Sequence, residues 1–117
     1  MADQLSLDEI LTLANNVTDV HREESEFRKG SDKKVITYRA RSENLYLTVL
    51  SHPYPGHDSM YEVSVLLGTC KVAEHVLLYD GKTPNKVLDV CKILESKYVP
   101  SDRETALIKA REILQKL

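Results

Sequence analysis

The sequence is poor in several residue types, with no tryptophan, one phenylalanine and two cysteines in 117 residues. Two cysteines are too few for the disulfide framework that staples small secreted domains. No segment approaches the run of about 18 apolar residues that a membrane-spanning helix needs. Met1–Gln4 lack the basic and apolar stretches of a secretory signal. We therefore expect a protein of a reducing, cytoplasmic setting that has no membrane partner.

The chain also lacks the motifs that carry common chemistries. It has no Walker loop, no dinucleotide-binding glycine pattern and no His-Glu-x-x-His zinc helix. Cys70 and Cys91 lie among apolar neighbours and away from the helix N-termini that activate thiols, so we expect both in the core. These absences favour a protein without a cofactor and without catalysis, while an enzyme stays open as an alternative.

Charge is ordinary in total and uneven along the chain. Charged residues make up 29% of the sequence and the net charge is -2, which gives no general attraction to nucleic acid. Residues 1–26 carry seven acidic side chains and one basic one, whereas residues 27–50 carry two acidic and six basic ones. Such blocks of opposite charge can orient a partner protein, or a second copy of the chain, as it approaches.

Three helices are predicted from their first turns. Ser6-Leu7-Asp8-Glu9 is a capping box, and apolar residues at helical spacing follow it, which predicts a helix over about 6–22. Thr83-Pro84 opens a second helix that ends before Pro100, and Ser101-Asp102-Arg103-Glu104 repeats the capping box for a third. The stripes expected of these two helices are Val87, Leu88, Cys91, Leu94 and Tyr98, and then Ala106, Ala110, Ile113, Leu114 and Leu117.

Four strands are predicted between the first two helices, at about 35–41, 45–50, 60–66 and 71–79. Short turns between successive strands favour an antiparallel four-stranded meander. With one helix before it and two after it, we expect a two-layer α+β fold in a single domain over residues 1–117. Both faces of the middle strands carry apolar side chains, which favours a homodimer that buries part of the second face.

The segment from Ser51 to Ser59 holds two prolines and a glycine, so we expect a stiff exposed loop there. Rigid exposed loops make good binding tips. The residues we expect to contact a partner are His52, Tyr54, His57 and Asp58 on this loop, with Arg39 and Arg41 beside the sheet. Two imidazoles and a carboxylate also leave open a small hydrolase or metal protein that uses His52, His57 and Asp58.

A nucleic-acid-binding module is the other alternative, because Arg28, Lys29, Lys33 and Lys34 form a basic stretch just before a predicted strand. The order of elements and Pro55-Gly56-His57 between two strands resemble the double-stranded RNA-binding domain, whose loop there is Gly-Pro-x-His. That family has a Lys-Lys pair at the start of its last helix, where this chain has Pro84-Asn85-Lys86. The resemblance implies binding to double-stranded RNA, and the departure at this pair leaves the family unassigned.

The sequence thus favours a small non-catalytic interaction or regulatory protein. We expect it to act by binding another protein, as a homodimer. It names neither that partner nor the symmetry of the dimer.

Overall fold

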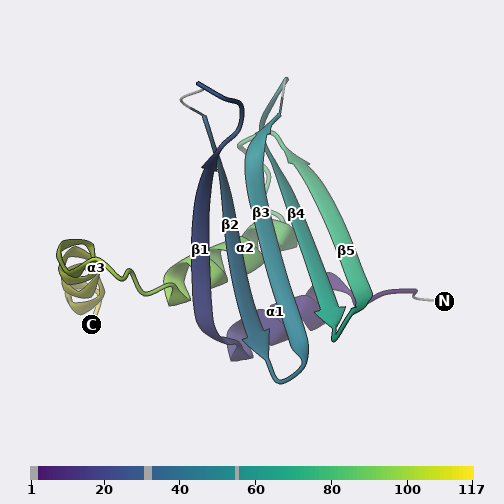
Figure 1. Cartoon of the computed structure of the whole chain (residues 1–117), viewed down its shortest axis with the longest axis horizontal. Coiled ribbons are helices and arrows are strands. Elements are labelled where there is room, and N and C mark those ends of the chain that lie inside the picture. The colour runs from purple at the N-terminus through teal and green to yellow at the C-terminus, as the bar shows by residue number, and fades with distance from the viewer. Residues whose placement is uncertain (1–2, 31–32, 55) are drawn as a thin grey trace.

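The computed structural model describes residues 3–30, 33–54 and 56–117, and its sheet is an antiparallel meander (Figure 1). Helix α1 precedes the sheet, and helices α2 and α3 follow it, so the α+β class and the order of the helices are confirmed. The elements are α1 (Leu7–Asn16), β1 (Thr18–Glu26), β2 (Lys34–Ser42), β3 (Leu45–Tyr54), β4 (His57–Leu67), β5 (Cys70–Tyr79), α2 (Lys86–Lys97) and α3 (Arg103–Gln115).

The sheet has five strands, and the prediction of four was wrong because residues 18–26 form β1. The predicted helix over 6–22 includes most of this segment, because Val17 and His21 continue its helical spacing. Helix α1 instead ends at Asn16, and Val17 adopts extended backbone angles as the C-cap. The following residues pair with β2 from Thr18 opposite Arg41 to Glu26 opposite Lys34. The hydrogen bonds that this segment makes with β2 outweigh its helical spacing, because most of its residues are polar and a helix would bury little apolar surface.

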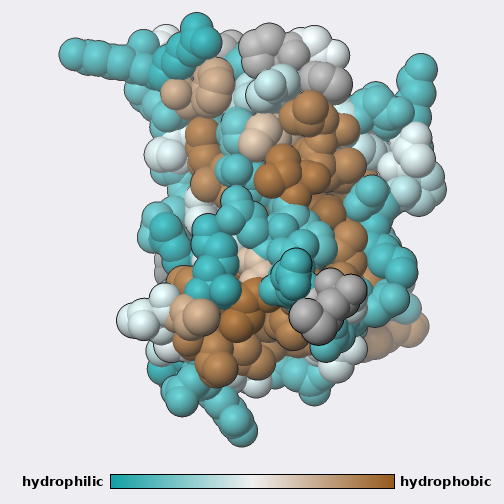
Figure 2. All heavy atoms as spheres, turned by 90° about the vertical axis from the view of Figure 1, so that its right-hand side faces the viewer, coloured by the Kyte–Doolittle hydropathy of each residue, from teal (hydrophilic) through white to brown (hydrophobic). Residues whose placement is uncertain are grey.

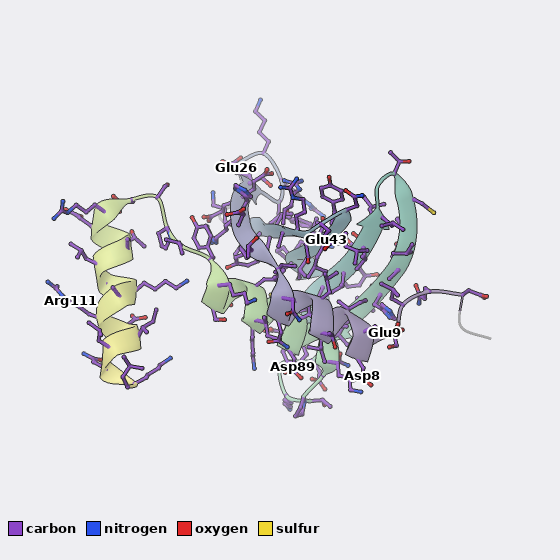
Figure 3. All side chains as sticks on the ribbon, turned by 90° about the horizontal axis from the view of Figure 1, so that it is seen from below. Asp8, Glu9, Glu26, Glu43, Asp89 and Arg111 are labelled. Atoms are coloured by element: carbon purple, nitrogen blue, oxygen red, sulfur yellow. The ribbon has the colours of Figure 1, made fainter. Side chains whose placement is uncertain are left out.

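Helices α1 and α2 cover one face of the sheet, as the view from below shows (Figure 3). Side chains directly opposite one another in neighbouring strands share a face, so each row of the inner face crosses the sheet. One such row is Ala40, Leu47, Val65 and Ala73, and all four side chains are buried. The expected stripe of α2 faces this layer, with Val87, Leu88, Cys91 and Leu94 buried.

The expected loop over residues 51–59 is mostly strand, which corrects the prediction. Strand β3 continues through Pro53 to Tyr54, and β4 begins at His57. Proline is tolerated here because the pairing of β3 with β2 ends at Ser51. The missing backbone N–H of Pro53 therefore removes no hydrogen bond to β2. Gly56 has a φ of +82°, which glycine adopts without strain in a tight connection. The connection is therefore short, and the pairing of β3 with β4 has a register irregularity between His52 and Tyr54.

Two helix caps also differ from the expected ones. Helix α2 begins two residues later than predicted, because Asn85 rather than Thr83 is the N-cap, and its side chain accepts a hydrogen bond from the backbone N–H of Val87. In α3 the side chain of Asp102, rather than that of Ser101, accepts from the backbone N–H of Thr105. At α1 the predicted capping box between Ser6 and Glu9 is confirmed.

Candidate functional site

The predicted contact residues of the 51–59 segment have separate surroundings. His52 stacks on Phe27 with ring centroids 6.0 Å apart, and its Nε2 atom lies 3.8 Å from a carboxylate oxygen of Glu62. Asp58 is exposed near Gly81, in the connection between β5 and α2. Tyr54 is exposed at the end of β3, and the side chain of His57 lies outside the described residues.

Arg39 and Arg41 lie on the outer face of the sheet, which α1 and α2 leave uncovered. Arg39 is exposed and forms an ion pair with Glu23 on β1. Arg41 is opposite Tyr46 on β3, and both side chains are exposed. His52 is on the same face, opposite Met60. The structure thus brings Arg39, Arg41 and His52 to one face of the sheet, although they lie in different rows.

The basic residues Arg28, Lys29, Lys33 and Lys34 gather at the connection between β1 and β2. Arg28 lies over the ring of Phe27, with its guanidinium carbon 5.3 Å from the ring centroid. This cation–π contact holds one of the four charges close to the sheet. The gathering comes from sequence proximity within one hairpin.

The structure describes how the groups that a metal site and a reactive thiol would need are placed. In residues 3–30, 33–54 and 56–117 no three His, Cys, Asp or Glu side chains are placed to hold one metal ion. Cys91 is buried, and burial raises the pKa of its thiol to about 11. Cys70 is exposed at the start of β5, so its predicted place in the core was wrong. It follows the turn at Gly68 and is paired with Leu67, which is itself half-exposed.

The free edge of β5 is a feature that we did not single out from the sequence. Leu5 lies along the first half of this edge, where its backbone N–H donates to the carbonyl of Val72 over 2.9 Å. The backbone N–H of Glu74 also points outward and donates to the side-chain oxygen of Gln4 over 2.8 Å. Gln4 and Leu5 therefore form an N-terminal strap that satisfies the edge as far as Glu74.

The second half of the edge has no such cover among the described residues. Backbone groups of an antiparallel strand point to the same side at every second residue. Since Val72 and Glu74 point outward, Val76 and Leu78 present their N–H and C=O groups outward as well. No turn, cap or strap hydrogen bond reaches these groups in the described chain. Two residues of edge backbone are thus open to another strand.

Apolar side chains accompany this open backbone. Val76 is 52% exposed and Leu78 is 43% exposed, and the half-buried Met60 lies opposite Leu78 on β4. Figure 2 faces the β5 side of the molecule and shows hydrophobic side chains in an upper and a lower group, with a hydrophilic band between them. We use the name β5 docking edge for the backbone of Val76 to Leu78 together with the apolar side chains of Val76, Leu78 and Met60.

The opposite edge of the sheet is built differently. Strand β1 has the sequence TDVHREESE, and eight of its nine residues are polar or charged. Charged edges discourage pairing with other chains, because a second strand would have to desolvate those groups. Strand β1 thus carries charged side chains of the kind that discourage added strands, whereas the end of β5 carries the apolar residues Val76, Leu77 and Leu78.

The last strand of a meander must be an edge, so the order of elements together with Val76-Leu77-Leu78 held a signal for this site. None of the helices in the described part of the chain is long and apolar enough to cross a membrane. Comparison of the chain with known protein families, with curated proteins and with solved structures finds no match.

Proposed function

We propose that the protein is a non-catalytic interaction module that binds an extended segment of another protein along the β5 docking edge. The observation that carries the proposal is the open backbone of Val76 and Leu78 beside their exposed apolar side chains. Adding a strand to such an edge gives affinity through backbone hydrogen bonds and specificity through alternate side chains.

The chemistry of the edge describes the segment that fits it. A strand paired with β5 sends every second side chain to the outer face, beside Val76 and Leu78. Those positions favour valine, isoleucine, leucine or an aromatic residue. The strap formed by Gln4 and Leu5 supports this mode, because it is an extended segment already paired with the same strand. It also limits the partner to the part of the edge beyond Glu74.

A library of random peptides displayed on phage tests the proposal without a known partner. We expect selected peptides to carry apolar residues at alternate positions and to lose binding when Val76→Lys and Leu78→Lys are combined. The matched control is Leu67→Lys, because Leu67 is equally exposed, at 51%, and lies at the other end of β4. Failure to select any peptide, or equal losses for both variants, would overturn the proposal.

A nucleic-acid module remains the second candidate, favoured by the four basic residues at the β1–β2 connection. If the protein is such a module, its affinity for RNA or DNA should fall steeply with added salt, because binding releases counterions. Charge reversal by Arg28→Glu and Lys29→Glu abolishes such binding and leaves selected peptides bound to the β5 docking edge. The two candidates therefore fail independently.

A further inference from the structure

Helix α3 stands apart from the helix layer, beyond the end of α2 (Figure 1). It has 13 residues and none of them is buried. A helix of this length is marginal in water on its own, because most helical stability in proteins comes from packing of an apolar face. The sequence nevertheless gives α3 an N-cap at Asp102 and an apolar stripe. The described fold therefore leaves the apolar residues of α3 exposed.

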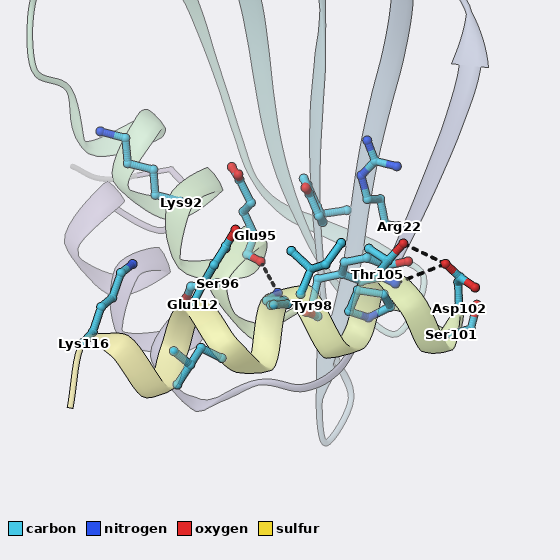
Figure 4. A pocket seen from close by; sticks show the side chains of 15 residues that line it. Arg22, Lys92, Glu95, Ser96, Tyr98, Ser101, Asp102, Thr105, Glu112 and Lys116 are labelled. Atoms are coloured by element: carbon cyan, nitrogen blue, oxygen red, sulfur yellow. Dashed lines mark hydrogen bonds between the residues drawn. The ribbon is translucent and has the colours of Figure 1, made fainter.

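One face of α3, which carries both polar and apolar side chains, is turned toward the rest of the molecule. An open groove of about 920 Å³ lies between α3, the end of α2 and the β1–β2 edge (Figure 4). Lys109 crosses it, donating to the backbone carbonyl of Glu95 over 3.1 Å and to that of Tyr98. The residues of α3 that line the groove are Thr105, Ile108, Lys109, Glu112, Ile113 and Lys116.

The opposite face of α3 follows a heptad-like spacing of four, three, four and three residues. This seam consists of Arg103, Leu107, Ala110 and Leu114 in the helix, with Leu117 one residue beyond the C-cap, and none of them lines the groove. Leu114 is 65% exposed. Arg111, which flanks the seam, points away from the rest of the molecule (Figure 3). A seam with this spacing is the pattern by which two helices pack side by side.

Charges beside the seam select the orientation of a second helix. Glu104 and Arg111 lie one heptad apart on the same flank, and neither side chain has an ion-pair partner among the described residues. In an antiparallel pair related by a two-fold axis, the same flank of each helix meets. Placing Leu107 against Ala110 of the second copy then puts Glu104 beside Arg111, twice. A parallel pair instead sets Arg103 against Arg103.

We infer that α3 is a dimerisation helix that binds the α3 of a second copy of this chain in an antiparallel, two-fold arrangement. Ala110 allows close approach at the centre, and the aliphatic stem of Arg103 covers Leu114 of the second copy. A helix of 13 residues is about 20 Å long, so the pair buries less than the roughly 1,600 Å² of a standard interface. The dimer should therefore dissociate at micromolar concentrations. This interface is separate from the β5 docking edge.

Sedimentation velocity over a concentration series tests the inference. We expect a monomer–dimer equilibrium that Leu107→Lys combined with Leu114→Lys abolishes. Ile108→Lys is the matched control, because Ile108 is 58% exposed on α3 but lies outside the seam. No α3 residue is buried in the described fold, so these variants should keep the far-ultraviolet circular dichroism of the sheet and of α1 and α2.

Charge exchange tests the orientation. Glu104→Arg alone and Arg111→Glu alone should each weaken the dimer several-fold at low salt, because like charges then meet. The double variant Glu104→Arg/Arg111→Glu should restore it. A chain that stays monomeric at all concentrations, or a dimer that survives the two seam substitutions, overturns the inference. A dimer that Val76→Lys and Leu78→Lys abolish instead would place the contact on β5 and also overturn it.

Discussion

Leu5 and Val72 are joined by a backbone hydrogen bond of 2.9 Å, although 67 positions separate them in the sequence. This bond ties the segment before α1 to the free edge of β5. It shows that the edge accepts an extended chain, and it marks where the covered part of the edge ends. The open part beyond it is the basis of the proposed function.

Loosening the strap should expose more of the edge. Gln4→Ala removes the acceptor of the outward N–H of Glu74. A hydrogen bond of this kind contributes about 1 kcal/mol, so we expect the Glu74 amide to exchange its hydrogen roughly fivefold faster. Nuclear magnetic resonance of the native protein in D2O measures this rate. The amide of Leu78, beyond the strap, should be unaffected, and an unchanged rate at Glu74 would show that the strap does not protect it.

Leu47 should carry much of the stability of the core. It is fully buried in the central strand, opposite Ala40 and Val65. Leu47→Ala removes apolar contacts and leaves a cavity, so we expect a loss of about 2–5 kcal/mol in the free energy of unfolding. Urea denaturation followed by circular dichroism measures it. Leu67→Ala, at a half-exposed position, should change the same free energy by less than about 0.5 kcal/mol.

The two thiols should differ in reactivity. Cys70 is exposed, whereas Cys91 is buried and burial raises the pKa of its thiol to about 11. Because the thiolate is the reactive form, iodoacetamide at pH 8 should label Cys70 in the native protein and Cys91 only after unfolding. Mass spectrometry of the digested protein identifies the labelled residue. Rapid labelling of Cys91 without denaturant would contradict the packing of α2 on the sheet.

The start of α3 should depend on pH through Asp102. Hydrogen bonds from the side chain and backbone of Thr105 lower the pKa of the Asp102 carboxyl. A carboxyl whose pKa is lower in the folded state stabilises the fold fully above its unfolded pKa of about 3.9. That stabilisation is lost as the pH falls through the lower folded value. The amide proton shift of Thr105 should therefore move below about pH 4. In Asp102→Ser, which caps without titrating, this transition should vanish.

The sequence predicted the helices and the core better than the sheet edges. Capping residues and apolar spacing are local signals, and they placed the start of α1 and the buried residues Val87, Leu88, Cys91 and Leu94 of α2 correctly. Tyr98 of the expected α2 stripe is only half-buried, and the expected stripe of α3 is not buried. The segment 18–26 was misassigned because it becomes a strand by pairing with β2, which is a non-local contact. Its mostly polar sequence lacks the alternating apolar residues from which a strand is predicted. The segment 51–59 was misassigned because Pro53 lies beyond the part of β3 that pairs with β2, where a proline is tolerated within a strand.

The candidate site was harder still to predict. Arg39, Arg41 and His52 were expected to form part of a contact surface, and they do share the outer face. The β5 docking edge depends instead on backbone groups, which every residue carries, and on the place where the N-terminal strap ends. Neither property is visible in side-chain chemistry. The available clue was the position of β5 as the last strand of the meander, together with its apolar run Val76-Leu77-Leu78.

Hydrogen exchange at the open edge is the most direct test of the proposed function. A peptide selected on the native protein is added, and the exchange rates of the Val76 and Leu78 amides are compared with and without it. We predict slower exchange at both amides, because the peptide accepts their hydrogen bonds. The Val76 N–H points outward and makes no hydrogen bond to β4, so Val76→Pro removes it without breaking the sheet. This variant should bind the peptide more weakly and keep the fold. Unchanged exchange at both amides with the peptide bound would contradict the account.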